Sequence, residues 1–122
     1  MIKTYKDLEV YKRSFDLAME IFWLSRKFPK EEMYSLTSQI NRSARSISAN
    51  ITEGWAKRNF EAVFKQHLIN SLGSNAETEN WLRFALECKY LDESTFGKLT
   101  SELDQIGKML YALHKNWKTH EK

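Results

Sequence analysis

Residues 96–117 read FGKLTSELDQIGKMLYALHKNW, and their apolar side chains recur at alternating intervals of three and four residues. The series consists of Phe96, Leu99, Leu103, Ile106, Leu110, Leu113 and Trp117. Side chains spaced in this way form one stripe of an α-helix and pack against neighbouring helices of a bundle. The stretch therefore predicts a long amphipathic helix near 94–117, which begins with an acidic, hydroxyl-bearing turn around Asp92.

Three further helices are predicted, near 7–28, 34–53 and 60–89. The second repeats the spacing with Leu36, Ile40, Ser43, Ile47 and Ile51. Pro29 ends the first helix, Gly54 is placed as a left-handed cap that ends the second, and Asn59 is placed as the cap of the third. The expected fold is all-α, an antiparallel up-down four-helix bundle that forms a single domain over residues 1–122.

The third helix has a small, polar middle on its core face, formed by Ser71, Ser74, Asn75 and Thr78. Small side chains permit a close approach between helices, which accounts for this narrow waist. A small-molecule site at His67, Ser71 and Thr78 is the alternative reading of the same residues.

The composition indicates one folded domain with a mildly basic character. The chain has 122 residues, 42% of them hydrophobic, and a net charge of +3. A single cysteine, Cys88, excludes an internal disulfide and fits a reducing compartment. The sequence has no apolar run of membrane-spanning length and no signal-peptide core at its start, so we expect a cytoplasmic protein.

The first helix carries two apolar stripes on roughly opposite sides, more than a corner helix of a bundle needs. One stripe contains Leu8, Tyr11, Phe15, Met19 and Phe22, and the other contains Val10, Leu17, Ile21, Leu24 and Phe28. One stripe must be covered by the N-terminal arm, a loop or another subunit. We assign the second stripe, from Val10 to Phe28, to an interface of a homo-oligomer.

Catalytic and metal sites are not predicted. None of the three histidines follows a carboxylate by three residues, the spacing that di-iron bundles use. Glu77 and Glu79 diverge around a helix and cannot chelate one ion together. Cys88 has no base beside it in sequence, and no glycine-rich phosphate loop occurs. We therefore expect a protein that is not an enzyme and that needs no cofactor.

The segment 41–59, NRSARSISANITEGWAKRN, gathers several cations beside an aromatic residue. On a helical projection Arg42 and Arg45 lie opposite the apolar face. The loop that is expected to follow Gly54 presents Trp55, Lys57 and Arg58. Such cations can neutralise phosphates, and an exposed indole can stack on a base. The alternatives are that both arginines are only solvated or pair with acids of a neighbouring subunit, and that Trp55 folds back to close the bundle end.

The run FPKEEMYSLTSQINRSARSISANITEG, residues 28–54, resembles the signature of the four-helix-bundle proteins encoded in intervening sequences of large-subunit ribosomal RNA genes. The flanking segments DLEVYKRSFDLAMEIF and HLINSLGSNAETENWL also resemble this family, so the similarity extends over nearly the whole chain. The matched polar positions are Gln39, Arg42, Asn50, Glu53 and Gly54, followed by a basic position at Arg58. The sequence departs from the pattern at Ser35, Asn41, Ser43 and Arg45.

The resemblance implies a homopentameric barrel of four-helix bundles. It also implies a relation to the accessory variability proteins of diversity-generating retroelements, which bind nucleic acid and associate with a reverse transcriptase. The leading hypothesis is therefore a homo-oligomer that binds RNA or DNA through Arg42, Arg45, Trp55, Lys57 and Arg58. A scaffold whose partners are only proteins is the alternative.

Overall fold

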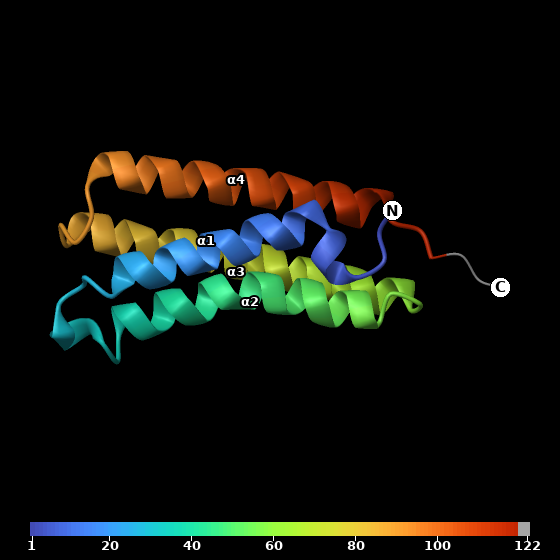
Figure 1. Ribbon diagram of the computed structural model, residues 1–122, viewed down its shortest axis with the longest axis horizontal. Helices are drawn as coiled ribbons and strands as arrows, with labels where there is room; N and C mark the ends of the chain where they lie inside the picture. The colour runs from blue at the N-terminus through green and yellow to red at the C-terminus, as the bar shows by residue number, and fades with distance from the viewer. Residues whose placement is uncertain (120–122) are drawn as a thin grey trace.

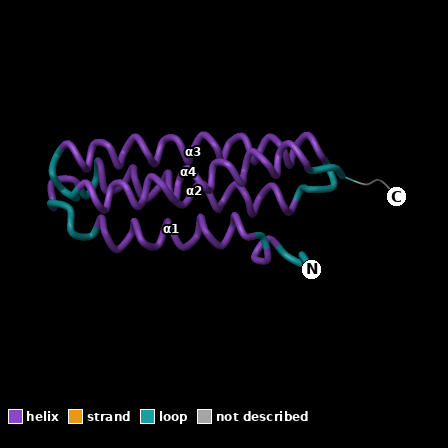
Figure 2. The backbone as a smooth tube through the Cα atoms, turned by 90° about the horizontal axis from the view of Figure 1, so that it is seen from above, coloured by secondary structure: helices purple, strands orange, loops and turns teal. Residues whose placement is uncertain are grey.

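The computed structural model describes residues 1–119 and contains four long helices that run up and down in turn (Figure 1). They are α1 (Glu9–Ser25), α2 (Leu36–Ala56), α3 (Glu61–Glu87) and α4 (Glu93–Asn116), with short 3-10 turns at Tyr5–Asp7 and Lys30–Glu32. The helices extend along one long axis and their connections lie at its two ends (Figure 2). The all-helical, four-helix class is confirmed, and residues 120–122 of the predicted domain lie outside the described part.

Several helix ends differ from the predictions. The first helix ends at Ser25 rather than near residue 28, and a turn follows in which the Phe28 amide donates to the Ser25 carbonyl at 3.1 Å. Asn59 is not the cap of α3, because Phe60 occupies that position and makes no side-chain capping bond. Asp92 does begin α4, since its carboxylate accepts a hydrogen bond from the Thr95 amide at 2.8 Å.

The stripe of α1 that was assigned to an oligomer interface belongs to the core of the protomer. Val10, Leu17, Ile21 and Phe28 are buried in the core of the protomer, and Leu24 packs partly buried against the same core. The assignment of these five residues to an oligomer interface is therefore wrong. The opposite stripe is exposed in its middle, where Phe15 is 47% and Met19 40% exposed, while Leu8 is buried.

The polar waist of α3 is filled by hydrogen bonds to α2 and, from Asn75, to the Leu103 carbonyl of α4. The hydroxyl of Thr78 donates to the hydroxyl of Ser43 at 2.9 Å, and that of Ser71 donates to the Ile47 carbonyl at 2.8 Å. Ser71 and Thr78 are fully buried. Because the helices themselves use these hydroxyl groups, the waist is a packing feature and offers no room for a small molecule at Ser71 and Thr78.

Gly54 lies inside α2 and does not cap it. The helix continues to Ala56, and no glycine of the described chain has a positive φ. A Cβ placed on Gly54 would lie 2.9 Å from the Cβ of His67 and 3.2 Å from the Phe64 ring on α3. The glycine is therefore required by the close approach of α2 and α3. The prediction of a left-handed cap is wrong, since the sequence pattern does not distinguish the two uses of glycine.

We expect Gly54→Ala to lower the free energy of unfolding by about 1–3 kcal/mol, because the added methyl group must push the two helices apart. Gly73→Ala is the matched control, since Gly73 lies in α3 with no atom within 4 Å of an added Cβ. That substitution should raise stability by about 0.5–1 kcal/mol through helix propensity alone. Urea unfolding of both variants measures the difference, and similar effects in both would contradict the role of Gly54.

Candidate nucleic-acid interface

Arginine side chains from α2 and from the cap that follows α1 lie beside the half-buried ring of Phe22 and the exposed ring of Trp23. On α2, Arg42 and Arg45 are exposed and lie one turn apart. The Arg45 guanidinium lies 5.7 Å from the centroid of the Phe22 ring on α1. Arg26 lies 5.7 Å from the same ring and 5.6 Å from that of Trp23. We call these five residues, Phe22, Trp23, Arg26, Arg42 and Arg45, the arginine face.

The arginine face is built by the antiparallel packing of α1 on α2. The side-chain amide of Asn41 donates to the Ser25 hydroxyl at 2.9 Å and to the Thr37 carbonyl at 2.8 Å. This contact holds the end of α1 against the start of α2. Trp23 remains 57% exposed beside Arg26, so its indole is accessible to a partner. Sequence reasoning missed Trp23 and Arg26, although their spacing of three residues was visible in the sequence.

Trp55 does not present an exposed indole. It is buried at the other end of the bundle, where its ring lies 5.8 Å from that of Trp117. The Arg58 guanidinium covers the Trp55 ring at 4.3 Å and donates to the Trp55 carbonyl at 2.9 Å. The expected stacking role of Trp55 is therefore wrong. The alternative, that the indole folds back to close the bundle end, is confirmed.

Residues after α4 complete this closure. The Trp117 indole donates to the Thr119 hydroxyl at 3.0 Å, and that hydroxyl donates to the Arg58 carbonyl at 2.7 Å. The Thr119 amide donates to the Glu61 carboxylate at 2.8 Å. This amide is the main cause that lowers the pKa of Glu61 below its usual value. The segment 57–61 is thus fixed to the C-terminal part of the chain, and Arg58 with it.

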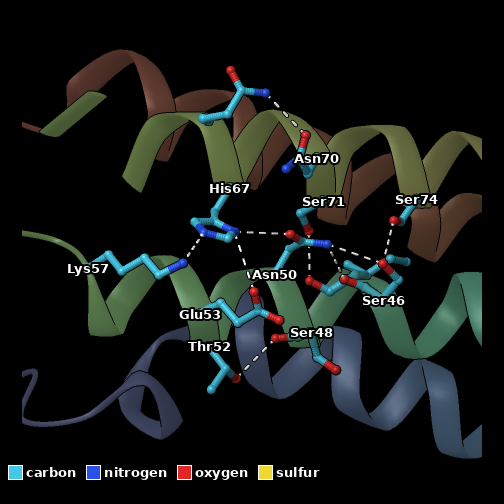
Figure 3. Close-up of polar contacts among 12 residues, drawn as sticks. Ser46, Ser48, Asn50, Thr52, Glu53, Lys57, His67, Asn70, Ser71 and Ser74 are labelled. Atoms are coloured by element: carbon cyan, nitrogen blue, oxygen red, sulfur yellow. Dashed lines mark hydrogen bonds and ion pairs between the residues drawn. The ribbon is translucent and has the colours of Figure 1, made fainter. Parts of the chain in front are cut away.

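Lys57 belongs to a polar network between α2 and α3 (Figure 3). Its ammonium lies 3.3 Å from Nε2 of His67, whose Nδ1 lies 3.1 Å from the side-chain oxygen of Asn50. An ammonium can only donate, so Nε2 accepts and the ring carries its proton on Nδ1. The carboxylate of Glu53 lies 4.0 Å from the same Nδ1. Lys57 therefore has a partner inside the protomer.

The predicted binding residues fall into two groups. A helical rise of about 1.5 Å per residue separates Arg45 from Lys57 by roughly 18 Å. The first group, Arg42 and Arg45, joins the arginine face. The second group, Lys57 and Arg58, lies at the opposite end of α2 and contacts His67 and Trp55.

Comparison with known proteins identifies the family of this chain. A model of the family described as 23S rRNA-intervening sequence protein matches residues 6–112. The chain belongs to this family. A solved structure of a protein of unknown function from the S23 ribosomal protein family of Bacteroides thetaiotaomicron is similar over 88% of this chain and 96% of that chain, with 28% identity and a TM-score of 0.80. A comparison with curated proteins found no match.

The polar positions of the family pattern line the edge of α2 that faces α3, apart from Arg42. Asn50 contacts His67 and also donates to the Ser46 carbonyl at 3.0 Å. Gly54 permits the close approach of the helices, and Gln39 is half-buried near the start of α2. Packing between α2 and α3 therefore accounts for Asn50 and Gly54, whereas Arg42 points outward and has no packing role.

No group of three or more His, Cys, Asp and Glu side chains among residues 1–119 is placed to hold a metal ion. No helix of the described structure is long and apolar enough to cross a membrane.

Proposed function

We propose that this protein is a non-enzymatic homo-oligomer that binds RNA or DNA through the arginine face. The observation that carries the proposal is that the guanidinium groups of Arg26 and Arg45 lie against the rings of Phe22 and Trp23, with the exposed Arg42 one helical turn from Arg45. Guanidinium groups form bidentate contacts with phosphate, and they are weakly hydrated when they lie against aromatic rings. Trp23 adds a stacking platform for an unpaired base.

The ion pairs among residues 1–119 do not involve Arg42 or Arg45, so these two arginines are available to a partner. Elsewhere in the protomer, Arg13 forms a bidentate ion pair with Glu102 at 2.7 and 2.8 Å, and Glu20 pairs with Lys98 at 3.5 Å. Within the described chain neither Arg42 nor Arg45 has an ion-pair partner. Their charges can therefore contribute fully to a polyanion partner, with an affinity that depends strongly on salt and weakly on base sequence.

The double variant Arg42→Gln, Arg45→Gln should weaken binding to a structured RNA and reduce the slope of log K against log salt concentration by about 1.4–1.8 per protomer. The matched control is Arg83→Gln, Lys115→Gln, which removes two exposed charges from α3 and α4. The control should leave the slope nearly unchanged. Fluorescence anisotropy over a series of salt concentrations measures both, and equal losses in the two variants would contradict a localised binding surface.

The exposed apolar side chains in the middle of α1 support self-association. Phe15 and Met19 are adjacent on the outside of the helix, and the Tyr11 ring stacks on Phe15 at 6.0 Å. Contiguous apolar surface of this kind marks an interface in soluble proteins. We place the subunit contact on Phe15 and Met19, further along α1 than Trp23. The pentameric stoichiometry and a reverse transcriptase as partner stay predictions from the resemblance.

We expect Phe15→Ser, Met19→Gln to shift the protein toward the 14.5 kDa protomer in size-exclusion chromatography with light scattering. Ile69→Ser is the control, because Ile69 is an apolar residue of α3 with a similar exposed fraction, 46%. It should leave the assembly unchanged. A wild-type protein that runs as a monomer at micromolar concentration would contradict the oligomer. An oligomer that binds no RNA would favour the protein-only scaffold.

A further inference from the structure

A pocket opens where the start of α2 meets the last turns of α3. The end of α1, the start of α2 and the end of α3 lie together at one end of the bundle (Figure 1). It encloses about 340 Å³, within the size range of small-ligand sites. Its lining residues are Glu32, Tyr34, Ser35, Leu36, Gln39, Trp81, Phe84 and Cys88. A larger hollow of about 1030 Å³ lies at the α3–α4 loop, and its single aromatic lining residue, Tyr90, already donates to Glu32.

The walls of the pocket are aromatic and held in place. The rings of Trp81 and Phe84 lie 5.8 Å apart, and Phe84 is 53% exposed. The Trp81 indole donates to the Glu77 carboxylate at 3.0 Å, which fixes its orientation. Glu32 accepts hydrogen bonds from the Ser35 and Tyr90 hydroxyls at 2.5 and 2.8 Å. The Glu32 carboxylate raises the pKa of Tyr90 to about 12, so this donor stays protonated at neutral pH.

The side-chain amide of Gln39 is a half-buried polar group of the pocket, whereas the Tyr34 side chain is 91% exposed. No hydrogen bond joins the Gln39 amide to another residue of the described structure. An apolar side chain in the pocket would bury this amide without a partner, which carries a free-energy cost. A flat ring with a hydrogen-bonding edge would satisfy the amide and stack on Trp81 or Phe84.

The charges around the pocket indicate which part of a nucleotide the pocket can hold. None of the residues that line the pocket is a lysine or arginine, so the pocket itself does not suit an anion. Arg42 lies one helical turn after Gln39 on α2 and is exposed. A nucleotide with its base in the pocket can therefore place its phosphate toward Arg42.

We propose that this pocket takes an unpaired base of a nucleic acid that is held on the arginine face. The base stacks on Trp81 and Phe84, and its edge bonds the Gln39 amide. This inference rests on the proposed function, and it adds a second, base-specific contact to binding that otherwise depends on phosphates.

The only cysteine of the chain reports on the pocket, because Cys88 is exposed and lies in its lining. The test compares the rate of Cys88 alkylation by a maleimide in the free protein, with single-stranded oligoadenylate, and with an abasic oligomer of the same length. Oligoadenylate should slow alkylation at least about five-fold, as expected for a stacked base. The abasic oligomer should bind through phosphates and leave the rate unchanged.

Phe84→Ala and Gln39→Leu should weaken oligoadenylate binding by roughly five- to hundred-fold and leave abasic binding and its salt slope intact. If both oligomers bind and neither slows the alkylation of Cys88, the proposal of a base in the pocket is overturned and the proposed function stands. Neither oligomer binding at low salt would overturn both. A cysteine that is unreactive in the free protein would mean that a second copy of the chain fills the pocket, which also overturns the inference.

Discussion

The close approach of α2 and α3 is the constraint on which the rest of the structure depends. Gly54 removes the side chain where the helices come nearest, and serine and threonine hydroxyls bond across the contact further along. Each such bond contributes about 1 kcal/mol, but a buried hydroxyl without its partner would cost more than that. The pair therefore has a single register, which fixes the edge of α2 that bears Asn50 and the outer face that bears Arg42 and Arg45.

The placement of α1 follows from that fixed pair. Asn41 ties the end of α1 to the start of α2, and the bidentate pair of Arg13 with Glu102 ties its first half to α4. These polar contacts determine how α1 is rotated about its axis. Its aliphatic stripe turns inward, and Phe15, Met19 and Trp23 remain outside. One helix thus supplies the uncovered apolar surface and the aromatic part of the arginine face.

Much of the fold could be predicted from the sequence. The spacing of apolar residues by three and four on α2 and α4 is explained only by helices that bury one stripe in a bundle. The two stripes of α1 could not be ranked in this way, since both are apolar and only the neighbouring helices decide which is buried. Trp55 and Gly54 show the same difficulty. An indole near the end of a helix can stack outward or close the core, and a glycine can cap or admit a neighbour. Contacts distant in sequence, with Trp117 and His67, settled both.

We propose that nucleic acid binds at the arginine face. Modification of arginines by phenylglyoxal, followed residue by residue with mass spectrometry, tests it most directly. With a structured RNA present, Arg26, Arg42 and Arg45 should react more slowly, while Arg58 and Arg83 should react as they do in the free protein. Unchanged reaction of Arg42 and Arg45 at saturating RNA would contradict the claim.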